Sequence, residues 1–123
     1  MNKYLNYSFL IRFGLGVIFI ANALTAFFAP AEFIELIKNS FVANLSPISP
    51  KAFVGVIIGF NDAIVGLLLM SGIATRRTAV WATVWLVGVM AVIGSSLDIL
   101  EHFGLIFMST ALILDSNYLT EHT

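Results

Sequence analysis

Long apolar segments separated by short polar ones make up most of this chain, and their lengths predict its elements. Three segments, residues 9–28, 52–73 and 78–97, are each close to the roughly 20 residues that a helix needs to cross the hydrocarbon core of a membrane. A fourth segment, residues 99–115, reaches spanning length only with Glu101 and His102 included. Apolar and polar residues do not alternate as they do in the strands of a membrane barrel. The pattern therefore predicts four membrane-spanning helices.

The fold expected from these segments is an all-α transmembrane four-helix bundle that forms a single domain over residues 1–123. Helices follow because lipid offers no hydrogen-bond partner, so each backbone group must be bonded within its own segment. The longest connection runs from Pro30 to Lys51 and begins with charged residues among apolar ones. That pattern favours a short helix lying in the membrane interface over residues 31–40.

Composition supports a protein whose solvent is lipid. Hydrophobic residues make up 59% of the chain and charged residues 11%, against about 45–50% and about 25% in soluble domains. The net charge of −1 provides no general attraction for nucleic acid. The sequence contains no cysteine, which excludes disulfides, thiol redox chemistry and thiolate metal sites in this chain.

Basic residues predict the orientation in the membrane, because Lys and Arg are enriched in cytoplasmic loops. Four of them lie at the N-terminal side or in the connection after residue 73, and two lie in the connection after residue 28. The two groups are Lys3, Arg12, Arg76 and Arg77, and Lys38 and Lys51. We therefore expect a multi-pass protein of the cell membrane with both termini in the cytoplasm.

A few polar side chains within the spans are the candidate ligand-binding residues: Asp62, Asn61, Asn22 and His102. With a rise of about 1.5 Å per residue, Asp62 lies about 15 Å, Asn22 about 10 Å and His102 about 7 Å from the outer boundary. Arg12 lies near the inner boundary instead. We expect Asp62 to lie inside the bundle and to meet Asn22 or His102, in a polar pocket that holds a quinone headgroup or a buried water.

Two interpretations of Asp62 remain open. An ionisable residue near the bilayer midplane is a candidate for function. Alternatively, a hydrogen-bonded or protonated Asp62 only fixes the helix register. We expect no metal site, since a stable site needs several ligands and only His102 among the histidines lies in a span. Neither a phosphate-binding loop nor a nucleophile elbow is present, so we predict no catalytic residue.

Small residues predict how the second span packs. Gly55, Gly59 and Gly66 recur at spacings of four and seven, on the same face as Asp62. Small residues at such spacing let helix backbones approach closely in membranes. We expect this face to turn toward the other helices.

Four stretches carry a resemblance to a known family. They read RFGLGVIF at residues 12–19, GFNDAIVGLLLMSG at 59–72, IATRRTA at 73–79 and LEHFGLIFMSTAL at 100–112. Together they resemble the DoxX-like family of small four-helix integral membrane proteins. The resemblance implies a membrane subunit associated with quinone-linked or other redox complexes.

The chain departs from that family's pattern at three places. Many relatives have Glu where this chain has Asp62. Many have a glycine and a basic residue late in the first helix, where this chain reads NALT at residues 22–25. Many have Arg-Asp before the last glycine, where this chain has Glu101 and His102. The missing basic residue removes the partner of an ion-pair site.

Three functions are therefore considered. The first is an accessory subunit of a membrane redox complex, near a quinone. The second is a non-catalytic scaffold or assembly factor, and the third is a small-molecule or ion transporter. Its expected partners are the lipid bilayer, other membrane or redox-complex subunits, and further copies of this chain.

Overall fold

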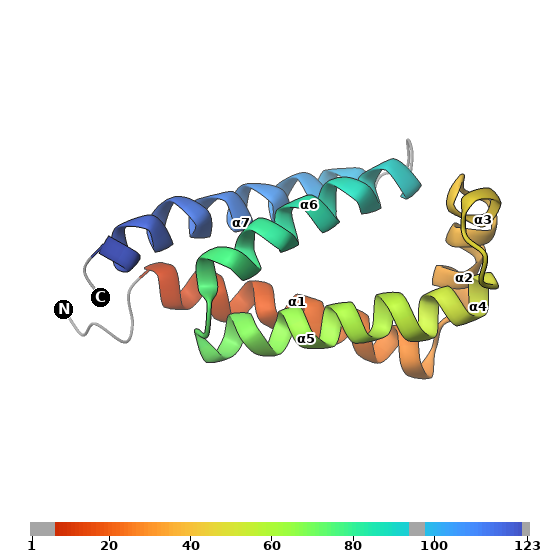
Figure 1. Cartoon of the computed structure of the whole chain (residues 1–123), viewed down its shortest axis with the longest axis horizontal. Helices are drawn as coiled ribbons and strands as arrows, with labels where there is room; N and C mark the ends of the chain where they lie inside the picture. Colours follow the sequence, from red (N-terminus) through yellow and green to blue (C-terminus); the bar gives the residue numbers. More distant parts are fainter. Residues whose placement is uncertain (1–6, 94–97, 122–123) are drawn as a thin grey trace.

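The computed structural model describes residues 7–93 and 98–121, and every element in those ranges is a helix. Four long helical stretches run along the molecule, and short helices gather at one end (Figure 1). The elements are α1 (Tyr7–Phe28), α2 (Ala31–Lys38), α3 (Val42–Leu45), α4 (Pro50–Ala52), η2 (Phe53–Ile58), α5 (Gly59–Ser71), α6 (Thr75–Ile93) and α7 (Asp98–Glu121).

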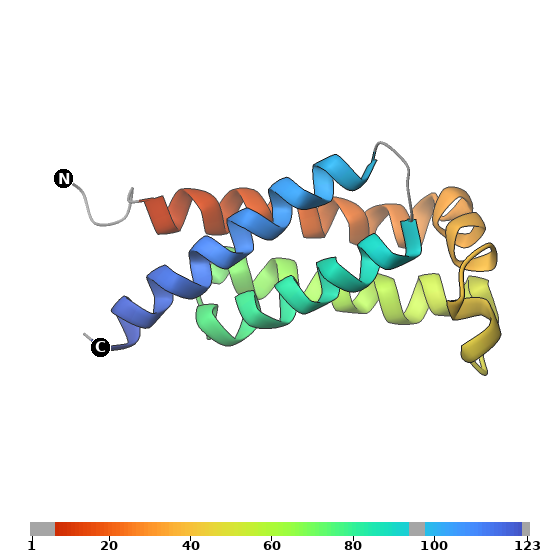
Figure 2. The same cartoon turned by 90° about the horizontal axis from the view of Figure 1, so that it is seen from above.

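The long helices form two pairs, α1 with α5 and α6 with α7. The pairs meet near the α5–α6 turn and diverge toward the end that carries α2 and α3 (Figures 1 and 2). Buried Leu15, Phe19 and Leu69 from the first pair meet Leu86 and Leu112 from the second in one hydrophobic core. The result is a wedge whose open side faces α2.

Glycines allow α1 and α5 to approach closely. A Cβ atom at Gly66 would lie 2.7 Å from the Ile20 side chain and 2.9 Å from the carbonyl oxygen of Gly16. A Cβ atom at Gly16 would lie 2.6 Å from the Met70 side chain. The prediction for Gly55 is wrong, because a Cβ atom there would meet nothing within 4 Å.

Local sequence sets the ends of these elements. Pro30 follows the end of α1, as expected for a residue that lacks a backbone donor. Ser49 caps α4 by accepting a 3.2 Å hydrogen bond from the Ala52 backbone N–H, with Pro50 at the first helical position. Gly72 ends α5 with φ +81°, a left-handed conformation that suits glycine.

The second predicted span is continuous but not uniform. It runs from α4 through η2 to the end of α5, and η2 is a π-helix. A π-helical turn has i→i+5 hydrogen bonds and often lies at a functional site. Here it lies directly before the helix that carries Asp62.

The observed bounds differ most from the predicted ones at α6 and α7, and the first two spans each begin two residues earlier than predicted. α6 begins at Thr75, so Arg76 and Arg77 lie in its first turn and not in a connection. The predicted end of that helix at residues 94–97 lies outside the described residues. α7 continues to Glu121, beyond the predicted residue 115. α2 occupies the predicted interfacial range, and α3 follows it as a further short helix.

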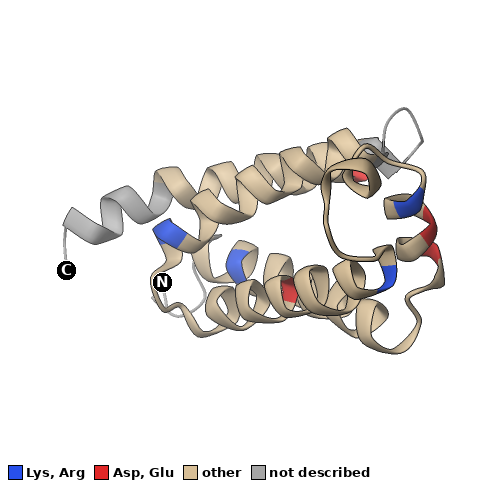
Figure 3. Cartoon of the chain, turned by 45° about the vertical axis from the view of Figure 1, so that its right-hand side comes forward, with Lys and Arg blue, Asp and Glu red and all other residues tan. Residues whose placement is uncertain are grey.

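The outer surface of the long helices is apolar. Large hydrophobic side chains are exposed on all four of them, for example Val17, Leu67, Val87 and Phe107. Two helices, Ser8–Phe28 and Pro50–Ser71, are long and apolar enough to cross a membrane by length and composition, and Leu100–Leu114 is a shorter apolar helix. Figure 3 shows the charged positions mostly at the two ends of the molecule. Lipid is the solvent that suits such a surface.

Candidate functional site

A cavity of about 460 Å³ occupies the open side of the wedge. Both helix pairs contribute to its walls, and α2 and α3 close its end. Most of the lining is aromatic or aliphatic, including Phe19, Phe33, Phe53 and Leu86. Its volume lies within the range of about 300–1,000 Å³ that is typical of small-molecule sites.

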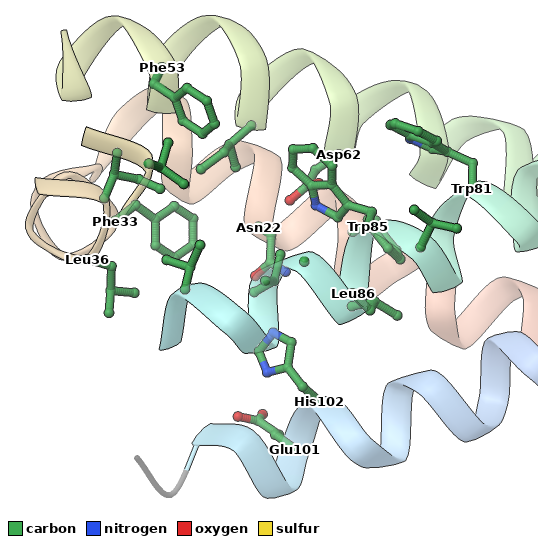
Figure 4. A pocket seen from close by; sticks show the side chains of 18 of the residues that line it. Asn22, Phe33, Leu36, Phe53, Asp62, Trp81, Trp85, Leu86, Glu101 and His102 are labelled. Atoms are coloured by element: carbon green, nitrogen blue, oxygen red, sulfur yellow. The ribbon is translucent and has the colours of Figure 1, made fainter. Parts of the chain in front are cut away.

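Asp62 on α5 is buried at the cavity wall, with only 3% of its surface exposed. Its Oδ1 accepts a 3.0 Å hydrogen bond from the side-chain amide of Asn61. Asn61 in turn accepts a 2.7 Å hydrogen bond from the indole nitrogen of Trp81. The Trp85 side chain also lies against the Asp62 carboxyl group (Figure 4). Two tryptophans of α6 therefore hold the Asn61–Asp62 pair of α5.

The structure brings Asp62, Asn22 and His102 to the same cavity. In Figure 4 the polar side chains follow one another from Asp62 on α5, past Trp85 and Asn22, to His102 and Glu101 on α7. Asn22 and His102 are partly buried, whereas Glu101 is exposed. The cavity therefore has a buried polar position at Asp62 and an exposed one at Glu101.

Arg12 lies outside the cavity, as expected from its predicted place near the inner boundary of the membrane. Its guanidinium carbon would be 3.2 Å from a Cβ atom at Gly72, in the α5–α6 turn, and 5.5 Å from the centre of the Phe9 ring. Its Nε is buried and has no hydrogen-bond partner among the residues that the structure describes. Arg12 therefore belongs to the opposite end of the molecule from α2 and does not line the cavity.

The exposed lining residues show where the cavity opens. Trp81, Val84 and Gly88 lie along one edge of α6, and Leu36 and Phe41 lie at the α2–α3 end. All five residues are exposed and uncharged, and the other exposed lining residue is Glu101 on α7. An opening with such a rim suits a ligand that approaches from an apolar phase.

The polar groups of the cavity favour a ligand that carries oxygen atoms on an apolar ring. Asp62 has two acceptor oxygens, Asn22 offers donors and an acceptor, and the His102 ring offers one of each when neutral. A carbonyl oxygen of such a ligand can accept a hydrogen bond from Asn22 or His102, and a hydroxyl group of the ligand can donate a hydrogen bond to Asp62. The aromatic lining offers flat apolar surfaces to such a ring.

Trp81 and Trp85 are the site residues that the sequence reasoning missed. Neither tryptophan is among the candidate site residues that the sequence predicts. The available signal was their spacing of four, which places both indoles on the same helix face. A tryptophan indole is only a donor, so two of them on one face indicate acceptors opposite.

Comparison with known families gives one result. The model described as DoxX matches residues 7–95, which include α1 through α6 and therefore Asn22, Asn61 and Asp62. His102 lies beyond the matched range. No match is found among curated proteins or among solved structures.

Proposed function

The chain belongs to the DoxX family, and we propose that it is the accessory subunit of a membrane redox complex, with a cavity that binds the headgroup of a quinone. The observation that carries this proposal is the 460 Å³ apolar cavity with Asp62, Asn22 and His102 in its wall. A buried carboxyl group in a membrane protein is costly unless it has partners or a role.

The proposal includes a four-span topology. α6 has 19 residues and α7 has 24, against 21 and 22 in the two candidate spans. Both helices pack along those spans and expose apolar side chains such as Val87 and Phe107 on their outer faces. If the first two spans are in lipid, those faces are in lipid as well. All four long helices then cross the membrane, and α2 lies at its surface.

A quinone matches both the chemistry and the opening of the cavity. Its ring is flat and apolar, and its two carbonyl oxygens accept hydrogen bonds. Its isoprenoid tail partitions into lipid and can leave the cavity across the apolar rim at Val84 and Gly88. Electrons and the oxidant or reductant are supplied by the partner subunits, since this chain has no redox-active cysteine.

Tryptophan fluorescence tests the binding directly. The chain has two tryptophans, Trp81 and Trp85, and both line the cavity. When the detergent-solubilised protein is titrated with a short-tail ubiquinone or menaquinone analogue, the tryptophan fluorescence should be quenched, and the quenching should saturate with quinone concentration. A non-quenching competitor of the same ring size should restore the emission.

Gly88→Leu supplies the decisive variant. Gly88 lines the cavity, and a Cβ atom there would meet nothing within 4 Å, so a larger side chain fills the cavity without displacing a neighbour. We expect Gly88→Leu to weaken quenching at least tenfold. Gly104→Leu is the matched control, since Gly104 also has open space around it and does not line the cavity. Equal linear quenching in both variants and in wild type would show partition into the micelle and reject the binding site.

The second candidate function is a scaffold or assembly factor. It is favoured by one observation: Asp62 accepts a hydrogen bond from Asn61, which accepts one from Trp81, so the carboxyl group is tied to the α5–α6 contact. In that case Asp62 stabilises the α5–α6 contact and binds no ligand. Purification of the protein with its partners in mild detergent distinguishes the two functions. If an oxidoreductase is purified with this chain, and the oxidoreductase loses quinone-linked turnover when this chain is removed, the redox role is favoured.

A further inference from the structure

A second hollow lies on the outside of the molecule, in the seam between α5 and α6. Its volume is about 320 Å³, and its lining is apolar except for a few positions. It runs from the Trp81–Asn61 hydrogen bond down to Ala74 in the turn between the helices. The lining residues are Asn61, Ile64, Val65, Leu68, Ala74, Arg77, Thr78 and Trp81. We call this hollow the seam groove.

Arg77 is the charged residue of the seam groove. It is exposed in the first turn of α6, and the neighbouring Arg76 is exposed as well but does not line the groove. Among residues 7–93 and 98–114, the acidic positions lie at the α2 end of the molecule or on α5, and Figure 3 shows basic positions alone near the α5–α6 turn in this part of the chain. Positive charge therefore collects where the seam groove reaches the end of the bundle.

We propose that the seam groove binds an anionic phospholipid, with the phosphate at Arg77 and an acyl chain along Ile64 and Leu68 toward Trp81. An apolar groove that ends at an arginine matches the two halves of such a lipid. Basic pockets between membrane helices are known sites for anionic headgroups. The bound lipid would cover the α5–α6 seam on the side where Trp81 holds Asn61. This site shares Trp81 with the cavity, but its other lining residues are its own, and it does not depend on the proposed quinone function.

Paired arginine variants test the headgroup. Arg77→Gln removes the charge inside the groove, and Arg76→Gln removes the adjacent charge outside it. Native mass spectrometry of protein released from micelles with equal amounts of phosphatidylglycerol and phosphatidylcholine should show retained phosphatidylglycerol for wild type and Arg76→Gln. Retention by Arg77→Gln should fall at least fivefold. An equal fall in both variants would show general attraction to basic residues and overturn the site.

A second pair of variants tests the acyl chain. Ile64 and Leu67 are both exposed on α5, and only Ile64 lines the seam groove. Ile64→Trp should fill the groove and reduce phosphatidylglycerol retention, while Leu67→Trp should not. Inorganic phosphate at millimolar concentration should not displace the lipid from wild type. Displacement by phosphate, or retention by Ile64→Trp equal to wild type, would show that no acyl chain is bound there and would reject the proposal.

Discussion

The indole N–H of Trp81 donates a 2.7 Å hydrogen bond to the side-chain oxygen of Asn61, across the seam between α6 and α5. The amide of Asn61 then donates to Asp62 at 3.0 Å. Asn61 therefore uses both halves of its amide and is fixed in one orientation. The orientation of the buried carboxyl group depends on a residue that does not itself line the main cavity.

The first prediction concerns this pair of residues. Trp81→Phe keeps an aromatic ring but removes the donor, and Asn61→Leu removes the acceptor. A double-mutant cycle should give a coupling energy of about 0.6–1 kcal/mol, the size of side-chain hydrogen bonds between membrane helices. Unfolding by sodium dodecyl sulfate, followed by circular dichroism, measures it. A coupling energy near zero would show that the bond contributes nothing to stability.

The second prediction concerns the crossing of α1 and α5. Gly66→Ala places a methyl group 2.7 Å from Ile20 and 2.9 Å from the backbone oxygen of Gly16, and the backbone cannot yield as a side chain can. We expect this variant to lower the free energy of unfolding by about 1–3 kcal/mol, the usual cost of overpacking. Gly14→Ala is the control, because a Cβ atom at Gly14 meets nothing within 4 Å. That control should be neutral or stabilising by up to about 1 kcal/mol through helix propensity. Thermal unfolding in detergent distinguishes the two, and equal midpoints would contradict the close crossing.

Much of the helical architecture is predictable from the sequence because apolar length and charge are local properties. Helices occur in all the ranges where the apolar runs lie. Asp62, Asn22 and His102 line one cavity, and their similar depth along the helices was sufficient to group them. Their binding of a ligand stays a prediction, as does the four-span topology.

The remaining features depend on contacts that the sequence does not specify. The divergence of the helix pairs makes the cavity, and it arises from packing along whole helices. Gly16 and Gly66 are 50 positions apart in the sequence, so their contact needs the crossing angle of α1 and α5. The π-helix at Phe53–Ile58 has the same apolar composition as an α-helix. Arg76 and Arg77 were placed in a connection because charges favour loops, but the first turn of a helix can also be at the membrane surface.

The third prediction concerns orientation. With Arg12, Arg76 and Arg77 at one end of the bundle and α2 at the other, the arginine end should face the cytoplasm. Reporter fusions after Thr123 and within residues 40–49 should then report opposite sides of the membrane. A phosphatase reporter should be active only in the second fusion, and a cytoplasmic fluorescent reporter only in the first. Reports from the same side would show that the number of spans between the two positions is even.

The fourth prediction separates the two roles of Asp62. Asp62→Asn keeps the size of the side chain and an acceptor oxygen for the Asn61 amide, so we expect stability within about 0.5 kcal/mol of wild type. Asp62→Leu leaves the partly buried Asn61 amide without that acceptor and should lower the free energy of unfolding by about 1–3 kcal/mol.

The functional consequence of those variants follows from the charge. If the carboxyl group exchanges a proton with the quinone ring, Asp62→Asn should abolish quinone-linked turnover of the partner complex while the amount of protein in the membrane stays unchanged. Glu101→Gln makes the same chemical change at an exposed position of the same cavity and should retain most turnover. Turnover of purified complexes and quantitative blots of membranes measure both quantities. Wild-type turnover with Asp62→Asn, together with assembly lost only in Asp62→Leu, would assign Asp62 to the α5–α6 contact alone, because an amide can hold Asn61 in place but cannot replace an ionisable group.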